Sequence, residues 1–444
     1  MNNRPETIGI VGGGVLGLTL ALRLAERGKH VTILERADHP GGLADAWQLG
    51  PIQWDRHYHV TLASDRFTMQ LLQELQLAEK VQWSQTKTGF LVDGKLYSMS
   101  NAQEFLKFPP LRLIDKIRLG WTIWHASKIR DWQKLERIPI GVWLLRHSGR
   151  RTFERIWKPL LKAKLGDAWE RTNAAFIWAT IQRMYAARNG GQKQEKFGYV
   201  SGGYQTFLNA MVDKLRDLNV RIACNTTVAQ IRSQSGGPVQ VHLADSERVT
   251  FDKVVVTSPT PARICPQLSP RERESLEKIE YIGIVCASLL LRKPLGGYYV
   301  TNITTPAPFT GIIEMSALVS PHELAGHGLV YLPKYAAQGD SIWSETDDQV
   351  QQSFLDGMRD LYPAFDADQV LEFRISRVKQ VFPLPVLNYS SNVLGTTTSQ
   401  PGIYLVNSSQ IVNGTLNVNE TIKLAESSID EICNVNASAF EESA

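Results

Sequence analysis

Cysteine is scarce in this sequence, and the few that occur lie far apart. There are four among 444 residues and none belongs to a C-x-x-C pair, so the sequence predicts neither a disulfide framework nor a bound metal. No apolar run reaches the length of a membrane-spanning helix. The first residues, MNNRPETIGIV, lack the charged and then apolar design of a signal peptide, so we expect a cytoplasmic protein.

Net charge is also low, at +4, but it is unevenly distributed. Residues 107–164 contain 15 Lys and Arg against four Asp and Glu, and seven of the 11 tryptophans lie between Trp121 and Trp178. Such a segment favours an anionic substrate or a membrane as partner, so 107–180 is a candidate for peripheral contact with the inner face of a membrane. The alternative is a helical cap whose tryptophans fill its own core and whose charges face water. We expect no nucleic-acid partner.

The chain opens with a β-α-β pattern, with an apolar strand at 8–12, an amphipathic helix at 14–27 and a second strand at 30–35. Asp93-Gly94 predicts a hairpin turn, and 101–190 has a helical pattern. Further strands are expected at 239–243, 248–251, 253–257, 283–292, 297–303, 311–316, 328–335 and 402–406, and further helices at 65–77, 345–361 and 415–430. The pattern predicts an α/β protein, α+β overall.

A glycine turn connects the first strand to the first helix. Gly12, Gly14 and Gly17 form G-x-G-x-x-G at this point. Gly12 allows the tight turn, Gly14 lets the backbone approach a pyrophosphate, and Gly17 lets the helix pack closely on the strand. The helix start, with Val15 and Leu16, then offers free N–H groups to the phosphates.

A carboxylate and a second glycine pair follow. Glu35 ends the second strand, where it would accept hydrogen bonds from the hydroxyls of an adenosine ribose. The complete pattern, GxGxxG followed by E-R-x-x-x-x-G-G, resembles the FAD-binding N-terminus of the flavin amine oxidase superfamily. That group includes monoamine oxidases, protoporphyrinogen oxidase, phytoene desaturases, UDP-galactopyranose mutase and the GDP-dissociation inhibitors. The matching residues are Gly12, Gly14, Gly17, Glu35, Arg36, Gly41 and Gly42.

The resemblance continues along the chain. YVSGGYQTFL resembles the family's GG-x-x-x-L segment, and VVVTSPTPAR is similar to its VV-x-A-x-P turn. Val228, in NTTVAQI, stands where the family places a residue against the adenine. PGIYLVNSSQIVNGTLNVNE resembles the closing strand and helix, which implies flavin contacts from Asn407, Leu416 and Asn417.

The resemblance implies a Rossmann-like FAD-binding domain of the GDP-dissociation-inhibitor and amine-oxidase type, with a mixed substrate domain inserted into it. The FAD-binding domain would comprise 1–65, 196–260 and 376–432, the substrate domain 66–195 and 261–375, the basic Trp-rich helical insert 107–190, and the tail 433–444.

The sequence departs from the family in three places. The arginine that often follows the second glycine pair is Leu43 here, and Asn407 stands where a closing aspartate is common. Cys286 takes the place of the amine-oxidase lysine, which argues against amine oxidation. No cysteine occurs between Cys286 and Cys433, so the resemblance implies non-covalent FAD.

The stretch WDRHYHV, residues 54–60, follows the second glycine pair and is expected to run across the flavin. In a strand, His57 and His59 would face one way, with Arg56 and Tyr58 opposite. We predict that the two histidines are catalytic, positioning substrate or moving a proton, and that Arg56 contacts the cofactor. The alternative is that either histidine is a packed structural residue.

These features predict a FAD-dependent oxidoreductase in which a lipophilic or anionic small molecule gives hydride to the flavin. Two alternatives stay open. One is a non-redox flavoenzyme that acts on a nucleotide sugar, like UDP-galactopyranose mutase. The other is a non-catalytic binding protein like a GDP-dissociation inhibitor, against which the intact glycine turns and Glu35 argue.

Overall fold

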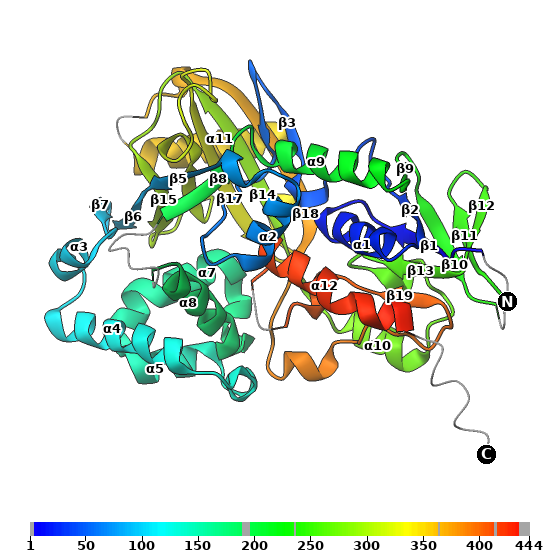
Figure 1. Cartoon of the computed structure of the whole chain (residues 1–444). Helices are drawn as coiled ribbons and strands as arrows, with labels where there is room; N and C mark the ends of the chain where they lie inside the picture. The colour runs from blue at the N-terminus through cyan, green and yellow to red at the C-terminus, as the bar shows by residue number, and fades with distance from the viewer. Residues whose placement is uncertain (1–3, 189–195, 235–236, 363–364, 413–414, 435–444) are drawn as a thin grey trace.

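The computed structural model describes residues 4–188, 196–234, 237–362, 365–412 and 415–434. A five-stranded parallel sheet lies on the right of Figure 1, with the strand order β19-β13-β1-β2-β9. Its strands are β1 (Thr7–Val11), β2 (His30–Leu34), β9 (Arg221–Ala223), β13 (Lys253–Val256) and β19 (Ile403–Leu405). The sheet therefore takes its strands from three stretches that lie far apart in the sequence.

The two faces of the parallel sheet have different partners. Val255 packs into a core to which three long helices contribute, whereas Val254 and Val256 pack under an antiparallel three-stranded sheet. The helices are α1 (Val15–Glu26), α9 (Tyr204–Asp217) and α12 (Val418–Asn434), and the three strands are β10 (Val228–Arg232), β11 (Val239–Leu243) and β12 (Arg248–Phe251). The predicted β-α-β opening is confirmed by β1, α1 and β2.

A seven-stranded mixed sheet lies at the upper left of Figure 1. In sheet order its strands are β18 (Val370–Pro383), β14 (Tyr281–Leu291), β17 (Gly328–Ala336), β16 (Gly311–Glu314), β15 (Tyr298–Ile303), β6 (Lys87–Val92) and β7 (Lys95–Ser98). All of β14 is buried, because α11 (Asp347–Leu361) packs near Val285 and Leu289 while Cys286 and Leu290 enter a second core.

Two short strand pairs complete the β structure. The first is the hairpin of β3 (Ala46–Leu49) and β4 (Ile52–Asp55), and the second pairs β5 (Val81–Gln85) with β8 (Lys196–Val200). The hairpin predicted at Asp93-Gly94 is confirmed: both residues have positive φ, +51° and +74°, as the tight turn between β6 and β7 requires.

A helical region, in cyan and green at the lower left of Figure 1, lies at the end of the molecule opposite the parallel sheet. It contains α3 (Ala102–Lys107), α4 (Leu113–Lys128), α5 (Ile140–Ser148), α6 (Arg150–Thr152), α7 (Lys158–Leu165) and α8 (Ala174–Arg188); the other helices are α2 (Arg66–Glu74) and α10 (Pro270–Glu277). Helix-breaking residues mark two of the helix ends, since Pro139 precedes α5 and Gly166 ends α7. In the part of the chain that the structure describes, no helix has the length and apolar character needed to cross a bilayer.

The tryptophans of this region divide between core and surface. Trp143 and Trp169 are buried among the helices, whereas Trp121 and Trp124 on α4 are 47% and 51% exposed. The buried pair fits the interpretation as a helical cap, and contact of the segment with a membrane stays a prediction.

Three features differ from the sequence-based expectations. Residues 56–60 form no strand, so alternation does not govern which way His57 and His59 face. The 14-residue strand β18 was not predicted, because its charged residues interrupt the apolar pattern; it lies at a sheet edge, where charges are tolerated. Helix α12 extends to Asn434, and 435–444 of the predicted tail lie outside the described residues. The predicted domain boundaries stay a prediction.

Candidate functional site

The first glycine turn is built so that only glycine fits. Gly12 has φ +111°, and a Cβ there would lie 2.3 Å from Thr257 Oγ1. A Cβ on Gly17 would lie 1.9 Å from the carbonyl oxygen of Gly12. Helix α1 begins at Val15 with no side-chain cap, because Gly14 has no side chain to bind its first-turn N–H groups, which include that of Leu16. This helix start suits a phosphate.

The second glycine pair packs directly on the first turn. The N–H of Gly41 donates to the carbonyl of Gly13 at 2.9 Å. Gly42 has φ +61°, and a Cβ there would come within 3.1 Å of Gly14 Cα. Side chains on these glycines would fill the surface beside the start of α1. The two loops together thus form a narrow backbone cradle, which fits the diphosphate of FAD. Leu43 follows in this loop and is half-buried.

Glu35 lies over the same turn. One carboxylate oxygen accepts from the N–H of Gly13, and the other accepts from Ala37 N at 2.8 Å. The N–H of Thr226 donates to the carbonyl of Glu35 at 2.8 Å, which brings the segment leading to Val228 beside it. The structure thus places the predicted ribose and adenine contacts next to the glycine turns. Arg36 is exposed.

The closing segment uses its predicted residues in local contacts. The side-chain oxygen of Asn407 accepts from Ser409 N at 3.0 Å and from Ser409 Oγ at 2.6 Å. Asn417 lies at the start of α12 and accepts from Glu420 N at 3.0 Å. Leu416 instead lines a cavity. The proposed flavin contacts of Asn407 and Asn417 would therefore use their remaining polar atoms or their backbone.

The two histidines of the 54–60 segment have different neighbours. His57 is buried, and its Nε2 lies 3.2 Å from the hydroxyl of Ser376 on β18. Burial, together with the charges of His59 and Arg56, lowers the pKa of His57 to about 3, so its imidazole is neutral. The imidazole of His57 thus contacts β18, and the catalytic role of the two histidines stays a prediction.

His59 belongs to a group around Asp55. Its ring stacks at a tilt on Tyr204, with centroids 4.9 Å apart, and its Nδ1 lies 3.7 Å from Asp55. Asp55 is buried and accepts from the N–H of Tyr204, the first residue of α9, at 2.8 Å. Burial raises the pKa of Asp55, although the nearby imidazole of His59 opposes this. The glycine turn before α9 is thereby attached to the 54–60 segment.

Arg56 pairs with Asp45, a buried carboxylate that the sequence reasoning did not select. The guanidinium lies 2.5 Å from Asp45 and 5.5 Å from the ring centre of Trp47. His39 contacts the other oxygen of the same carboxylate at 2.6 Å. Asp45 comes three residues after Gly42. A carboxylate this close to the second glycine pair could have indicated the residue from the sequence.

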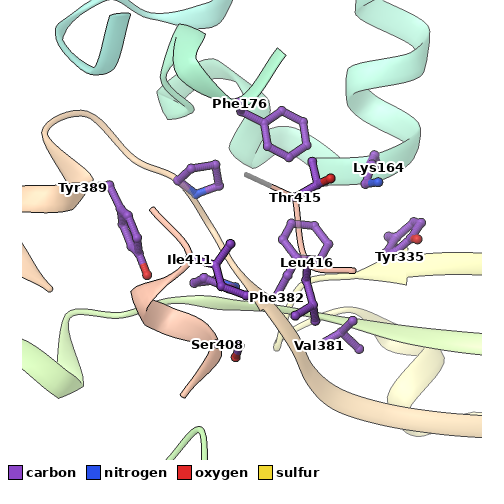
Figure 2. A pocket seen from close by; sticks show the side chains of 12 residues that line it. Lys164, Phe176, Tyr335, Val381, Phe382, Tyr389, Ser408, Ile411, Thr415 and Leu416 are labelled. Carbon is purple, nitrogen blue, oxygen red and sulfur yellow. The ribbon is translucent and has the colours of Figure 1, made fainter. Parts of the chain in front are cut away.

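A cavity lies where the helical region, β18 and the closing segment meet (Figure 2). It is lined by Lys164, Phe176, Tyr335, Val381, Phe382, Pro383, Pro385, Tyr389, Ser408, Ile411, Thr415 and Leu416. Lys164 Nζ lies 5.2 Å from the ring centre of Tyr335 and 5.9 Å from that of Phe382. Tyr58 reaches this wall, since its hydroxyl lies 2.7 Å from that of Tyr335. No motif indicated Lys164, Tyr335 or Phe382.

Cys286, which stands in the place of the amine-oxidase lysine, is fully buried in β14 opposite Ser376. Burial raises the pKa of its thiol to a value at which it stays protonated. Within the described residues no cluster of three or more His, Cys, Asp or Glu could hold a metal ion.

Comparison with known proteins identifies the family. The model of the family "Flavin containing amine oxidoreductase" matches residues 17–409. The 15-cis-phytoene desaturase of Glycine max is 20% identical over 399 residues, which cover 82% of this chain and 68% of that protein.

Two solved structures share the fold. Reduced UDP-galactopyranose mutase superposes with a TM-score of 0.74 at 14% identity, covering 97% of this chain and 96% of that one. A fatty acid isomerase from P. acnes that produces CLA superposes with a TM-score of 0.72 at 15% identity, covering 96% and 98%. Since the family model covers most of the sequence, and the glycine cradle fits its cofactor FAD, this chain belongs to the flavin-containing amine oxidoreductase family.

Proposed function

We propose that the protein oxidises a lipophilic substrate that carries an anionic group. FAD, held at the glycine cradle and Glu35, supplies the hydride acceptor. The observation that carries the proposal is the cavity in Figure 2, which has aromatic walls, one lysine and a border with the closing segment at Leu416. The fatty acid isomerase from P. acnes, which acts on a substrate that combines these two properties, has the same fold.

Lys164 is the anion-binding group in this proposal. Among the described residues no carboxylate pairs with it, whereas Lys162, on the same helix, lies 4.0 Å from Asp167. Its ammonium instead lies near two aromatic rings, an arrangement that leaves it available to a carboxylate. The cavity has a volume of about 60 Å³, which suits the end of a substrate rather than a whole molecule.

The 54–60 segment would form the other side of the reaction site. Tyr58 positions Tyr335 through their shared hydrogen bond. His57, being neutral, can donate or accept one hydrogen bond but carries no charge to stabilise an anion. We propose His57 as a positioning group through Ser376, and His59, next to Asp55, as the group that moves a proton. The FAD is proposed to be non-covalent.

Anaerobic flavin reduction tests the proposal. A panel of long-chain carboxylic acids and the matching alcohols is mixed with the holoenzyme, and bleaching of the flavin absorbance is followed. We expect reduction by members of the acid series and, for Lys164→Gln, a KM raised by at least about tenfold, because one charged hydrogen bond contributes about 1.5–3 kcal/mol. Lys162→Gln is the matched control. Equal KM values for both variants, or preference for the alcohols, contradict the role of Lys164.

A non-redox sugar mutase is the second candidate, favoured by the likeness to UDP-galactopyranose mutase over nearly the whole chain. It predicts that only chemically reduced enzyme interconverts a UDP-sugar, without change in the flavin spectrum. A protein that binds no FAD on reconstitution would instead support a purely binding function.

We also propose that the helical region contacts a membrane surface, from which a lipophilic substrate would reach the cavity. Lys164 on α7 and Phe176 on α8 both belong to this region, so the cavity and the proposed contact share one body of packed helices.

A further inference from the structure

Helix α4 turns an apolar face to solvent. Leu113, Ile114, Ile117, Trp121 and Trp124 are between 47% and 65% exposed. Their spacing of one, three and four residues places them along a single stripe of the helix. Leu106 on α3 and Val142 and Leu145 on α5 are 57%, 56% and 40% exposed, and they extend the same apolar character to the adjoining helices. These eight residues are called the α4 face below.

The opposite side of α4 already has its partners. Leu119, Thr122 and Ala126 are buried, and α4 packs on both α5 and α8. The exposed stripe is therefore not the core-facing side of α4, because the helix buries a different face against α5 and α8. In Figure 1, α3, α4 and α5 form the outer end of the molecule. An exposed apolar patch of this size marks a binding surface.

Basic residues surround the α4 face. Exposed cations on or next to these helices are Lys107, Arg112, Arg118, Lys128, Arg146 and Arg150. Among the described residues none of the six forms an ion pair. The ion pairs found in the helical region use Lys134, Arg151, Arg155, Lys158, Lys162, Arg171 and Arg183 instead. An apolar stripe with unpaired cations beside it is the arrangement that binds the interface of an anionic bilayer.

We propose that the α4 face docks on an anionic lipid bilayer, with Trp121 and Trp124 at the headgroup level and the surrounding cations on lipid phosphates. This inference rests on the proposed function for its purpose, the delivery of a lipophilic substrate. A second copy of the chain is a poorer occupant, because a symmetric dimer through this face would set the same cations against one another. Helix α4 packs on α8, and Phe176 of α8 lines the cavity, so one helix connects the docking face to the cavity wall.

Flotation of the FAD-loaded protein with vesicles tests the docking. Phosphatidylcholine vesicles are compared with and without phosphatidylserine, at low and high salt. We expect binding that requires phosphatidylserine and weakens with salt. The variant Ile114→Glu with Ile117→Glu is expected to lower the bound fraction at least about tenfold, since it places two charges in the apolar stripe. The matched control is Leu371→Glu with Leu387→Glu, two leucines that are each 37% exposed outside this face.

Brominated lipids give a second readout. They quench indoles that enter the interface, so Trp121→Phe with Trp124→Phe is expected to remove most of the quenching while leaving flotation largely intact. Wild-type protein that stays in solution, or equal binding by both Glu pairs, overturns the proposal. So does a dimer in solution that Ile114→Glu with Ile117→Glu dissociates. Vesicle binding and flavin reduction are independent, so loss of one with retention of the other shows which proposal is wrong.

Discussion

The phenol oxygens of Tyr58 and Tyr335 lie 2.7 Å apart, although 277 residues separate them in the sequence. Tyr58 belongs to the segment that follows the second glycine pair, and Tyr335 belongs to the wall of the cavity. The contact therefore connects the segment expected to cross the flavin to the pocket proposed for substrate. Burial, with the neighbouring phenol, raises the pKa of Tyr58, so its hydroxyl is protonated and can donate to that of Tyr335.

This pair predicts a measurable coupling. Tyr58→Phe and Tyr335→Phe are each expected to lower the free energy of unfolding by about 1 kcal/mol, the net value of one hydrogen bond. The double variant should lose less than the sum, because either change alone already removes the bond. Urea unfolding of the four proteins, all with FAD, measures the coupling energy. Strict additivity would show that the two hydroxyls act independently in solution.

The glycine cradle predicts a selective loss of cofactor. Gly42→Ala places a methyl group 3.1 Å from Gly14 Cα, between the two turns that are proposed to hold the diphosphate. Gly94→Ala is the matched control, since Gly94 also has positive φ, +74°, but its Cβ would meet nothing within 4 Å.

Both glycine variants should lose about 1 kcal/mol of stability from backbone strain. Only Gly42→Ala is expected to lose FAD as well, seen as a lower ratio of flavin to protein absorbance and a raised Kd on titration. If the two variants retain FAD equally, the second glycine pair does not form part of the cofactor site.

Local sequence patterns predicted the elements that form because of local residue preferences. The turn at Asp93-Gly94, the β-α-β opening and the strands 239–243 and 248–251 needed only residue preference and periodicity. Strand β18 was not predicted because its residue pattern is that of a strand at a sheet edge. Its position at the edge depends on the tertiary fold, which the local sequence does not reveal.

The site was predictable to a similar degree. The cofactor glycines and Glu35 sit close together in sequence, and the structure places them beside one another. Lys164, Tyr335 and Phe382 come from three distant elements, so only the tertiary fold assembles the cavity. The alternation argument for His57 and His59 was wrong because it assumed a strand, whereas β4 ends at Asp55.

A buried ion pair attaches the helical region to the rest of the chain. Arg183 on α8 binds both carboxylate oxygens of Asp65, at 3.1 and 2.8 Å, and Asp65 is only 3% exposed. Arg183→Met leaves this buried carboxylate without its charged partner, which should cost about 3 kcal/mol of stability. The control Arg216→Met removes an exposed pair with Asp213 and should change stability by less than about 1 kcal/mol.

Adding Asp65→Asn to Arg183→Met removes the isolated charge and should restore part of the loss, measured by urea unfolding. A double variant less stable than Arg183→Met alone would contradict this. It would mean that the hydrogen bond from Leu62 N to the carboxylate, at 2.9 Å, contributes more stability than removal of the unpaired charge restores.

The buried imidazole of His57 makes a prediction about acid stability. Its pKa is about 3 in the fold, against 6.5 in the unfolded chain. Between these values the unfolded state binds more protons than the native state, so stability must fall as pH falls from 6.5 toward 3, by at most about 1.4 kcal/mol per pH unit from this group. Above pH 6.5 the group contributes no pH dependence.

Carboxylates also titrate in this range, so the test is a difference between variants. His57→Gln cannot gain a proton, and it should therefore unfold with a shallower loss of stability between pH 6.5 and pH 5 than the wild type, while His30→Gln, at an exposed strand residue, should follow the wild type. Urea midpoints at closely spaced pH values measure this slope. Parallel curves for wild type and His57→Gln would mean that solvent reaches His57. Solvent would then also reach the contact with Ser376, on which the positioning role of His57 depends.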